Sequence, residues 1–155
     1  MRVLRFTDEN IETITSPDWT ELLAHPEGVI WVDMVGPTPE DTRLMHDVFH
    51  FHPLAIEDTG NQRQRPKVEE YRDHLFIILN PVDTFDDELT FRELDVFLTR
   101  TMIVTVHSAE HEPAVEHVMG RCNAKIEAGQ KVSVGFLIYA LADIVVDLYF
   151  PILDK

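Results

Sequence analysis

Two adjacent carboxylates occupy positions that suit a bound cation better than they suit the local structure. Glu57 and Asp58 fall in the last turn of a short helix that we expect over residues 53–59. The negative end of the helix dipole disfavours an exposed anion there by about 0.3–1 kcal/mol, and a bound cation would reverse the sign of that interaction. Asp143 lies farther along the chain, in an apolar stretch that also has a helical pattern.

This apolar stretch, residues 132–153, has one face that carries acids. At 100° per residue, Asp143, Asp147 and Asp154 fall within about 40° of one another. The same face carries aromatic side chains, at Phe136, Tyr139 and Phe150. The pattern is typical either of an interface that holds carboxylates or of an ordinary solvent-facing stripe. A buried aspartate costs about 2.5–3.5 kcal/mol at the centre of a bilayer, so we expect that the stretch does not span a membrane.

Carboxylates without cysteine ligands or a complete histidine set select hard cations. Magnesium and calcium both prefer oxygen ligands, and magnesium keeps several waters and takes only one or two carboxylates. The acidic run Asp83–Glu88 lacks the glycine of a calcium-binding loop, and we expect a solvated hairpin tip there. Sparse acids therefore favour magnesium.

The histidines do not complete a zinc motif. They cluster loosely, at His46, His50 and His52 and at His107, His111 and His117. An H-E-x-x-H motif would need a second histidine at position 115, which is valine, so we expect partly exposed histidines without a metal. No G-x-S-x-G turn or phosphate-binding glycine loop is present either. We therefore expect no catalytic residues, no organic cofactor and no enzymatic activity.

The amino-acid composition excludes several classes of protein and partner. The chain has 155 residues, with 28 acidic and 13 basic side chains, for a net charge of −15. Such a polyanion repels nucleic acids and anionic lipid headgroups and attracts cations. The single cysteine, Cys122, excludes an internal disulfide. We expect one domain over residues 1–155.

The elements that must position the carboxylates follow from hydrophobic periodicity and capping residues. We expect an edge strand over 1–6, a helix capped by Ser16, a buried strand over 29–32, and a helix from Thr38 to Phe51. The helix over 53–59 should end at Gly60 in a left-handed conformation. Strands over 68–71, 75–80, 91–98 and 102–107 should be antiparallel neighbours, followed by helices over 113–128 and 132–153. This order predicts a layered α/β domain with a mixed sheet.

Several segments resemble one known family. They are His52-Pro53-Leu54-Ala55-Ile56-Glu57-Asp58, Arg63-Gln64-Arg65-Pro66-Lys67-Val68-Glu69, His74–Leu79, Leu94–Leu98, Ile103–His107 and Leu137–Asp143. Together they resemble the cytoplasmic domain of CorA-type divalent-cation (magnesium/cobalt) transporters, over about residues 28–154. The segment 52–79 is the most specific part.

The resemblance implies a three-layer α/β/α sandwich with a central mixed, largely antiparallel sheet. In this family such a domain forms the intracellular funnel of a homopentameric channel, at the cytoplasmic face of the cell membrane. We expect the chain to stop before the stalk and membrane helices, so that only those missing helices would contact the membrane. By itself it should be a monomer or a weak dimer.

The resemblance also implies the metal sites. Asp58 would take part in a regulatory site between subunits, and Glu57 and Asp143 in a second site nearby. Magnesium is the expected regulatory ion, with cobalt and zinc as further candidates, and binding should be weak without the stalk. In this interpretation the carboxylates lack neutralising partners and repel one another when magnesium falls, which opens the pore.

Three other interpretations stay open. The histidine content fits a zinc-transporting branch of the same family. The acidic chain also fits a free-standing interaction module. A zinc hydrolase would require tightly bound, stoichiometric zinc.

Overall fold

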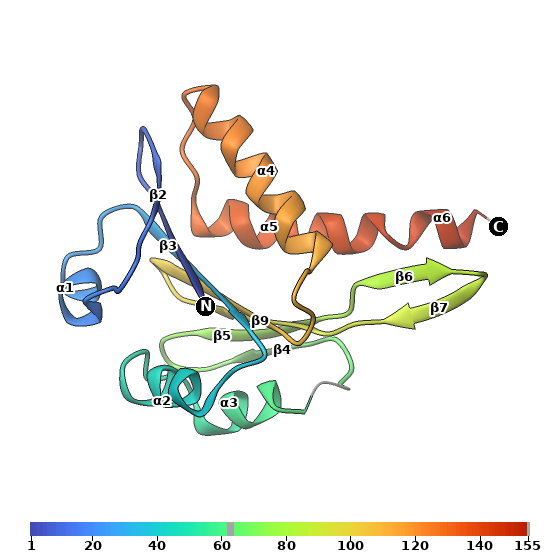
Figure 1. Ribbon diagram of the computed structural model, residues 1–155, viewed down its shortest axis with the longest axis horizontal. Helices are drawn as coiled ribbons and strands as arrows, with labels where there is room; N and C mark the ends of the chain where they lie inside the picture. The colour runs from blue at the N-terminus through green and yellow to red at the C-terminus, as the bar shows by residue number, and fades with distance from the viewer. Residues whose placement is uncertain (62–63, 155) are drawn as a thin grey trace.

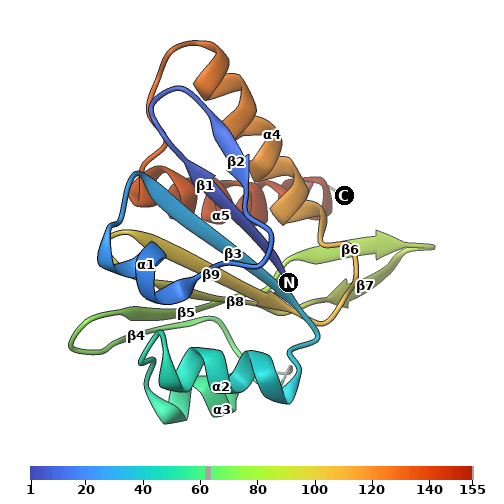
Figure 2. The same ribbon diagram turned by 60° about the vertical axis from the view of Figure 1, so that its left-hand side comes forward.

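Seven strands form a mixed sheet that lies between two layers of helices (Figure 1, Figure 2). The computed structural model describes residues 1–61 and 64–154. The strand order is β2-β1-β3-β9-β8-β5-β4, and neighbouring strands are antiparallel except for the parallel pair β3 and β9. The strands of this sheet are β1 (Arg2–Phe6), β2 (Ile11–Thr13), β3 (Val29–Val35), β4 (Lys67–Glu70), β5 (Leu75–Leu79), β8 (Leu94–Leu98) and β9 (Met102–His107).

The helices divide between the two faces of the sheet (Figure 2). One face is covered by α1 (Trp19–Ala24), α2 (Pro39–Asp47) and α3 (Pro53–Thr59). The other is covered by α4 (Pro113–Glu127) and α5 (Val134–Asp147), and α6 (Phe150–Leu153) follows α5. The predicted α/β/α sandwich with a largely antiparallel mixed sheet is confirmed.

The central strands are buried on both faces, which gives two separate cores. Strand β9 is buried along its whole length, as expected of a strand covered on both sides. Toward α4 and α5 the core contains Trp31 and Leu137, both fully buried. Toward α2 and α3, the ring of Phe97 stacks on Phe51 with centroids 4.2 Å apart. The two cores hold α3 and α5 on opposite sides of the sheet.

Helix starts follow local sequence more closely than helix ends do. Thr38 forms the expected cap of α2. Its side chain accepts a hydrogen bond from the Asp41 N–H, and the Asp41 side chain accepts one from the Thr38 N–H. The expected cap at Ser16 is wrong: Asp18 caps α1 by accepting from the Glu21 N–H. The expected left-handed Gly60 is also wrong, since its φ is −81°.

The sheet differs from the expectation at two places. Strand β1 is not an edge strand, because β2 pairs with its outer side. The expected strand over 91–98 is two strands, since β7 (Glu88–Phe91) ends before β8 begins at Leu94. Helix α2 likewise ends at Asp47 rather than near Phe51, and His50 takes a left-handed φ of 57° before α3.

The acidic run forms the tip of a separate hairpin, as predicted. Strands β6 (Val82–Phe85) and β7 pair only with each other and extend beyond the sandwich (Figure 1). Asp86 and Asp87 take positive φ values of 51° and 62° between them. Two successive positive φ angles are typical of the tight turns that match the twist of a hairpin.

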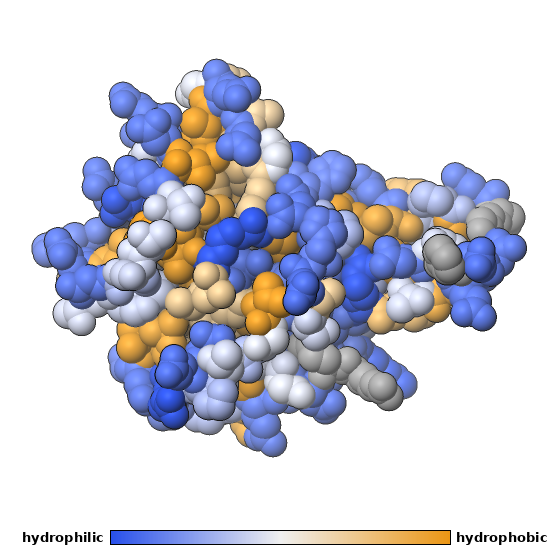
Figure 3. Space-filling view, viewed as in Figure 1, coloured by the Kyte–Doolittle hydropathy of each residue, from blue (hydrophilic) through white to orange (hydrophobic). Residues whose placement is uncertain are grey.

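The apolar C-terminal helix is interrupted between α5 and α6, and part of it packs in the core. By length and composition alone, Val134–Leu153 could cross a bilayer, with a mean hydropathy of 2.0 and 28% of it buried. Core helices also have this composition, and α5 buries residues against the sheet, at Leu137, Ala140, Leu141, Ile144 and Val145. Apolar patches interrupt the hydrophilic surface over α5–α6 and the hairpin (Figure 3).

Candidate functional site

The last turn of α3 presents Glu57 and Asp58 toward solvent. The helix begins where His52 accepts a hydrogen bond from the Leu54 N–H, with Pro53 in the first turn. Its other side is fixed by buried residues, at Ala55, Ile56 and Thr59. Burial of that side leaves Glu57 exposed and Asp58 partly exposed.

Asp58 is paired with a lysine on the edge strand β4. Lys67 Nζ lies 2.8 Å from Asp58 Oδ2 and 2.5 Å from Glu69 Oε1, and the Tyr71 hydroxyl donates to Glu69 Oε2 at 2.6 Å. Hydrogen bonds to Asp58 and Glu69 raise the pKa of Lys67. The bond from Lys67, followed by that from Tyr71, lowers the pKa of Glu69, and Glu69 raises the pKa of Tyr71 to about 12. These groups form one continuous chain of charge-assisted hydrogen bonds.

The segment after α3 is anchored by Gln64, which the sequence interpretation did not single out as a functional residue. Its Nε2 donates to the backbone carbonyls of Asp58 at 3.1 Å and Asn61 at 3.2 Å. Its backbone N–H donates to Glu93 Oε1 at 2.6 Å, and Glu93 is buried beside the start of β8. Gln64 therefore ties the end of α3 to the sheet. Arg63, in the same sequence segment, lies outside the described residues.

Asp143 lies on α5 and is paired with an arginine of α4. Arg121 Nη1 donates to Asp143 Oδ2 at 3.0 Å, and both side chains are partly exposed. The guanidinium carbon of Arg121 also lies 5.9 Å from the centroid of the Phe136 ring. The aspartate face of the helix is therefore outside the core, with Asp147 and Asp154 exposed.

The structure does not bring the predicted metal ligands together within one chain. Glu57 and Asp58 lie on α3 and Asp143 lies on α5, on opposite sides of the sheet (Figure 1). Across residues 1–61 and 64–154, no three or more His, Cys, Asp or Glu side chains form a group that could hold a metal ion. Carboxylate donors still suit a magnesium ion, which takes one or two of them and keeps its waters.

The expectation that these carboxylates lack neutralising partners is wrong for two of them. Asp58 is paired with Lys67 and Asp143 with Arg121. Glu57 is exposed, and its carboxylate forms no ion pair with the described part of the chain. Lys67 and Arg121 lie 9 and 22 residues away from their aspartates, so the helix pattern alone gave no signal for them.

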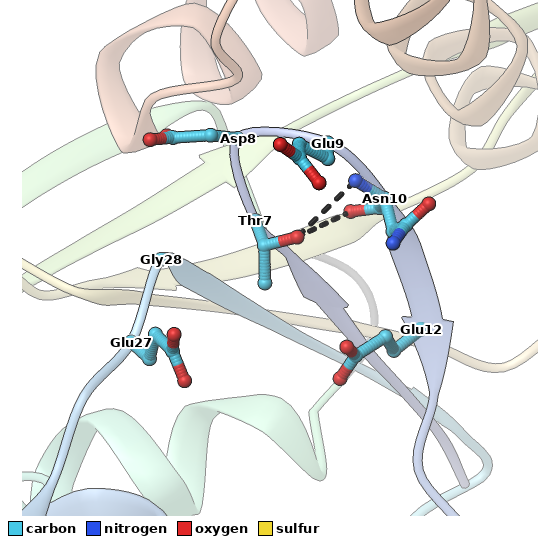
Figure 4. A pocket seen from close by; sticks show the side chains of 7 residues that line it. All are labelled: Thr7, Asp8, Glu9, Asn10, Glu12, Glu27 and Gly28. Carbon is cyan, nitrogen blue, oxygen red and sulfur yellow. Dashed lines mark hydrogen bonds between the residues drawn. The ribbon is translucent and has the colours of Figure 1, made fainter.

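A second acidic region lies at the β1–β2 turn, around a hollow of about 340 Å³ (Figure 4). Glu12 and Glu27 point toward the hollow from its two sides, whereas Asp8 points away (Figure 4). Arg5 already neutralises Glu12, with Nη2 2.5 Å from Oε2. The turn itself is closed by hydrogen bonds between Thr7 and Asn10. With Glu12 held by Arg5, the region does not bring together three acidic or histidine ligands among the described residues.

A buried polar network, also missed from the sequence, connects β3 and β9. The Trp31 indole N–H donates to Thr105 Oγ1 at 2.9 Å, and Thr105 donates to Asp33 Oδ1 at 2.6 Å. His107 Nε2 lies 2.9 Å from the same Asp33 oxygen, and Nδ1 lies 2.7 Å from the Ala109 carbonyl. Burial lowers the pKa of His107, but the hydrogen bond and charge of Asp33 outweigh burial and raise it overall.

The other histidines are not part of this network. His111 and His117, which the sequence groups with His107, are exposed. His46 is exposed beside Asp47, at 2.8 Å. The expectation of exposed histidines is confirmed for these three and is wrong for His107, which is buried.

Comparisons with known proteins agree with this fold. The family model described as "CorA-like Mg2+ transporter protein" matches residues 26–155. The cobalt/magnesium transport protein CorA of Thermotoga maritima is 31% identical over 132 residues, covering 81% of this chain and 36% of that protein. YfjQ of Bacillus subtilis, whose name describes a metal ion transporter, is 37% identical over 125 residues, covering 81% and 38%.

Solved structures share the fold at lower identity. The CorA magnesium transporter from Methanocaldococcus jannaschii has a TM-score of 0.71 at 18% identity, covering 98% of this chain and 46% of that one. The ZntB cytoplasmic domain from Vibrio parahaemolyticus has a TM-score of 0.73 at 12% identity, covering 99% and 62%. The chain thus spans less than half the length of the curated relatives named above. It belongs to the family of CorA-like magnesium transporter proteins.

Proposed function

We propose that this chain is the domain with which a CorA-type magnesium/cobalt channel senses intracellular divalent cations and gates transport. Family membership supports this assignment, because the family consists of ion transporters rather than enzymes. The named relative from Thermotoga maritima is a cobalt/magnesium transport protein. In the whole protein, a stalk and membrane helices would follow this domain and place it at the cytoplasmic face of the membrane.

One observation carries the sensing part of the proposal: the candidate ligands are accessible but separated by the sheet. Glu57 and Asp58 face outward from α3, and Asp143 faces outward from α5 on the other side. One chain therefore offers two incomplete sets of oxygen ligands. A magnesium ion could complete its shell with carboxylates from a neighbouring subunit and with water.

An assembly of identical subunits would create such sites repeatedly, and the proposed assembly is a homopentamer. Exposed apolar side chains on α5 and α6 support contact with other chains, at Tyr139, Val146, Phe150 and Leu153. Without the stalk, the domain would bind magnesium weakly and remain a monomer or weak dimer.

Many sites are needed because each one contributes little. With free magnesium near the dissociation constant, one site stabilises the bound state by RT ln 2, about 0.4 kcal/mol. About ten such sites would contribute about 4 kcal/mol, which shifts a two-state population by about a thousandfold. Bound magnesium would hold the subunits in the closed arrangement, and its loss would leave carboxylates that repel one another.

The test uses the full-length transporter that contains this domain. We expect the double variant Glu57→Ala/Asp58→Ala to keep conducting when internal magnesium is high, whereas the wild-type channel closes. A matched control, Asp8→Ala/Glu9→Ala, removes two neighbouring exposed carboxylates from the β1–β2 turn and should close normally. Retained closure in the first variant would reject the sensing assignment.

The same cells can report which ion is carried. Uptake of magnesium or cobalt supports the proposed function. Uptake of zinc with exclusion of magnesium would assign the protein to a zinc-transporting branch. Absence of any ion flux would favour a free-standing acidic interaction module.

A further inference from the structure

We infer that Lys67 and Arg121 are built-in counter-ions that a divalent cation must displace from Asp58 and Asp143, so that these two basic residues set the cation concentration at which the domain responds. This inference rests on the proposed function, because it concerns the same carboxylates. It replaces the expectation of unneutralised acids with an exchange of one cation for another.

Lys67 can leave Asp58 without losing all of its partners. Its Nζ contacts Asp58 Oδ2 at 2.8 Å and Glu69 Oε1 at 2.5 Å. The Tyr71 hydroxyl holds the other oxygen of Glu69, so that carboxylate stays in place. If a divalent ion takes Asp58, Lys67 keeps its ion pair with Glu69. The ammonium group of Lys67 therefore still has an anionic partner after it leaves Asp58.

Arg121 has a comparable second partner. It contacts Asp143 through one nitrogen only, Nη1 at 3.0 Å, and not through the two-pronged geometry that gives arginine its strongest carboxylate pairs. Its guanidinium also lies 5.9 Å from the Phe136 ring. An arginine released from Asp143 keeps that cation–π contact.

Both pairs are open to solvent, which allows an ion to reach the carboxylates. The exposed side-chain fractions are 29% for Asp58 and 38% for Asp143, with 34% for each basic partner. Ion pairs with this exposure are weak, because water screens them. Lys67 and Arg121 therefore oppose divalent binding only moderately, and removing either should tighten it by about two- to fivefold.

The position of the two basic residues also predicts the direction of the effect. A divalent ion next to Asp58 carries two charges where Lys67 carried one. Such an ion can also bridge Asp58 to a carboxylate of a neighbouring subunit, which the ammonium group of Lys67 cannot do. Loss of Lys67 would free Asp58 in every subunit and shift the closed state to lower magnesium.

The experiment measures magnesium-dependent protection of the purified full-length transporter from chymotrypsin, a readout that does not depend on ion flux. The variants are Lys67→Met and Arg121→Met. We expect the magnesium midpoint of protection to fall by about two- to fivefold in each. Lys67→Arg keeps the charge and should stay near the wild-type midpoint. Lys131→Met, which removes an exposed lysine only 3.6 Å from Asp8, is the matched control and should leave the midpoint unchanged.

The outcomes separate this inference from the proposed function. One outcome would overturn the counter-ion inference alone. In it, magnesium protects the wild-type protein, protection is lost in Asp58→Ala, and the magnesium midpoint does not fall in Lys67→Met. Absence of magnesium protection in the wild-type protein would overturn the proposed function and this inference with it. Thermal unfolding without magnesium checks that each variant folds, and Lys67→Gln replaces Lys67→Met if that variant does not.

Discussion

A buried carboxylate–cation pair between β3 and β9 differs from two partly exposed pairs in its surroundings more than in its distance. Asp33 and His107 lie 2.9 Å apart between β3 and β9, with 4% and 2% of their side chains exposed. Asp58–Lys67 and Asp143–Arg121 have similar distances, 2.8 and 3.0 Å, but are partly exposed. Burial, and not distance, therefore separates the two kinds of pair, and we expect it to make the first fixed and the other two exchangeable.

In the buried pair, Asp33 Oδ1 and both ring nitrogens of His107 have hydrogen-bond partners. Asp33 Oδ1 faces both Thr105 and His107, and both ring nitrogens of His107 face oxygen atoms. Both nitrogens therefore donate hydrogen bonds when the ring is protonated. Arg2 Nη2 lies 3.7 Å from the other Asp33 oxygen. Because His107 Nδ1 also meets the Ala109 carbonyl, the network ties the loop that leads into α4 to the sheet.

The strongest test of the difference between the buried and the exposed pairs is to remove the buried acid, Asp33. Asp33→Ala leaves the His107 ring and the Thr105 hydroxyl without their acceptor, and we expect a loss of about 3–5 kcal/mol in the free energy of unfolding. Urea-induced unfolding at pH 7 measures it. Asp58→Ala is the paired control on the exposed side, with an expected loss below about 1 kcal/mol. Equal losses in the two variants would contradict the distinction.

Removing one hydroxyl from the network should have a smaller effect. Thr105→Val conserves shape but leaves the Trp31 indole N–H unpaired and takes a donor from Asp33. We expect a loss of about 1–3 kcal/mol, because a buried donor without a partner keeps its full desolvation cost. Thr90→Val on the exposed strand β7 should change stability by less than about 0.5 kcal/mol. The network would have no energetic role if both variants unfolded at the wild-type urea concentration.

The pH dependence of stability should show the buried pair as well. The pKa of His107 is raised in the folded state by Asp33, with Glu112 adding to the effect. The contribution of His107 to the free energy of unfolding is therefore complete at pH values below its pKa in the unfolded state, about 6.5. That contribution is lost as pH rises through its pKa in the folded state. Each unit of difference is worth about 1.4 kcal/mol.

Unfolding free energies at pH 6 and pH 8 measure this loss, with His107→Gln as the reference. The difference between the two pH values should be larger in the wild-type protein than in His107→Gln. The same difference in both proteins would show that other groups cause it.

The smallest effect is expected at the exposed pairs. Lys67→Met or Arg121→Met should change the unfolding free energy by less than about 1 kcal/mol, since partly exposed ion pairs contribute little. The change should shrink further in 1 M salt, where the screening length is about 3 Å. A loss as large as that of Asp33→Ala would show that these pairs are structural and not exchangeable.

Local sequence signals predicted the elements that carry the candidate site. The start of α2 at Thr38 follows from its capping residue and the start of α3 from Pro53 in the first turn, signals that act within a few residues. Strand β9 follows from a run of β-branched and apolar residues. The resemblance of the segments in and around these elements then indicated the family correctly.

Long-range contacts decided what the sequence could not predict. Strand β1 is internal because β2, only three residues long, pairs with its outer side. At the helix interruption after α5, the Tyr149 hydroxyl donates to the Asn80 carbonyl 69 residues earlier. The partners of Asp58, Asp143 and Asp33 likewise come from other elements, so neither the exchangeable pairs nor the buried network had a local signal.

The parallel pairing of β3 with β9 has a consequence for the order of events in folding. Trp31 and Thr105, which meet across this pair, are 74 residues apart in the chain. Closing so long a loop is entropically costly, and proteins that depend on such pairings fold slowly. During synthesis β3 must wait for β9 to leave the ribosome, so the β3–β9 pair cannot form until more than two thirds of this chain has been made. Chaperone dependence should therefore be greatest for nascent chains that end before residue 107.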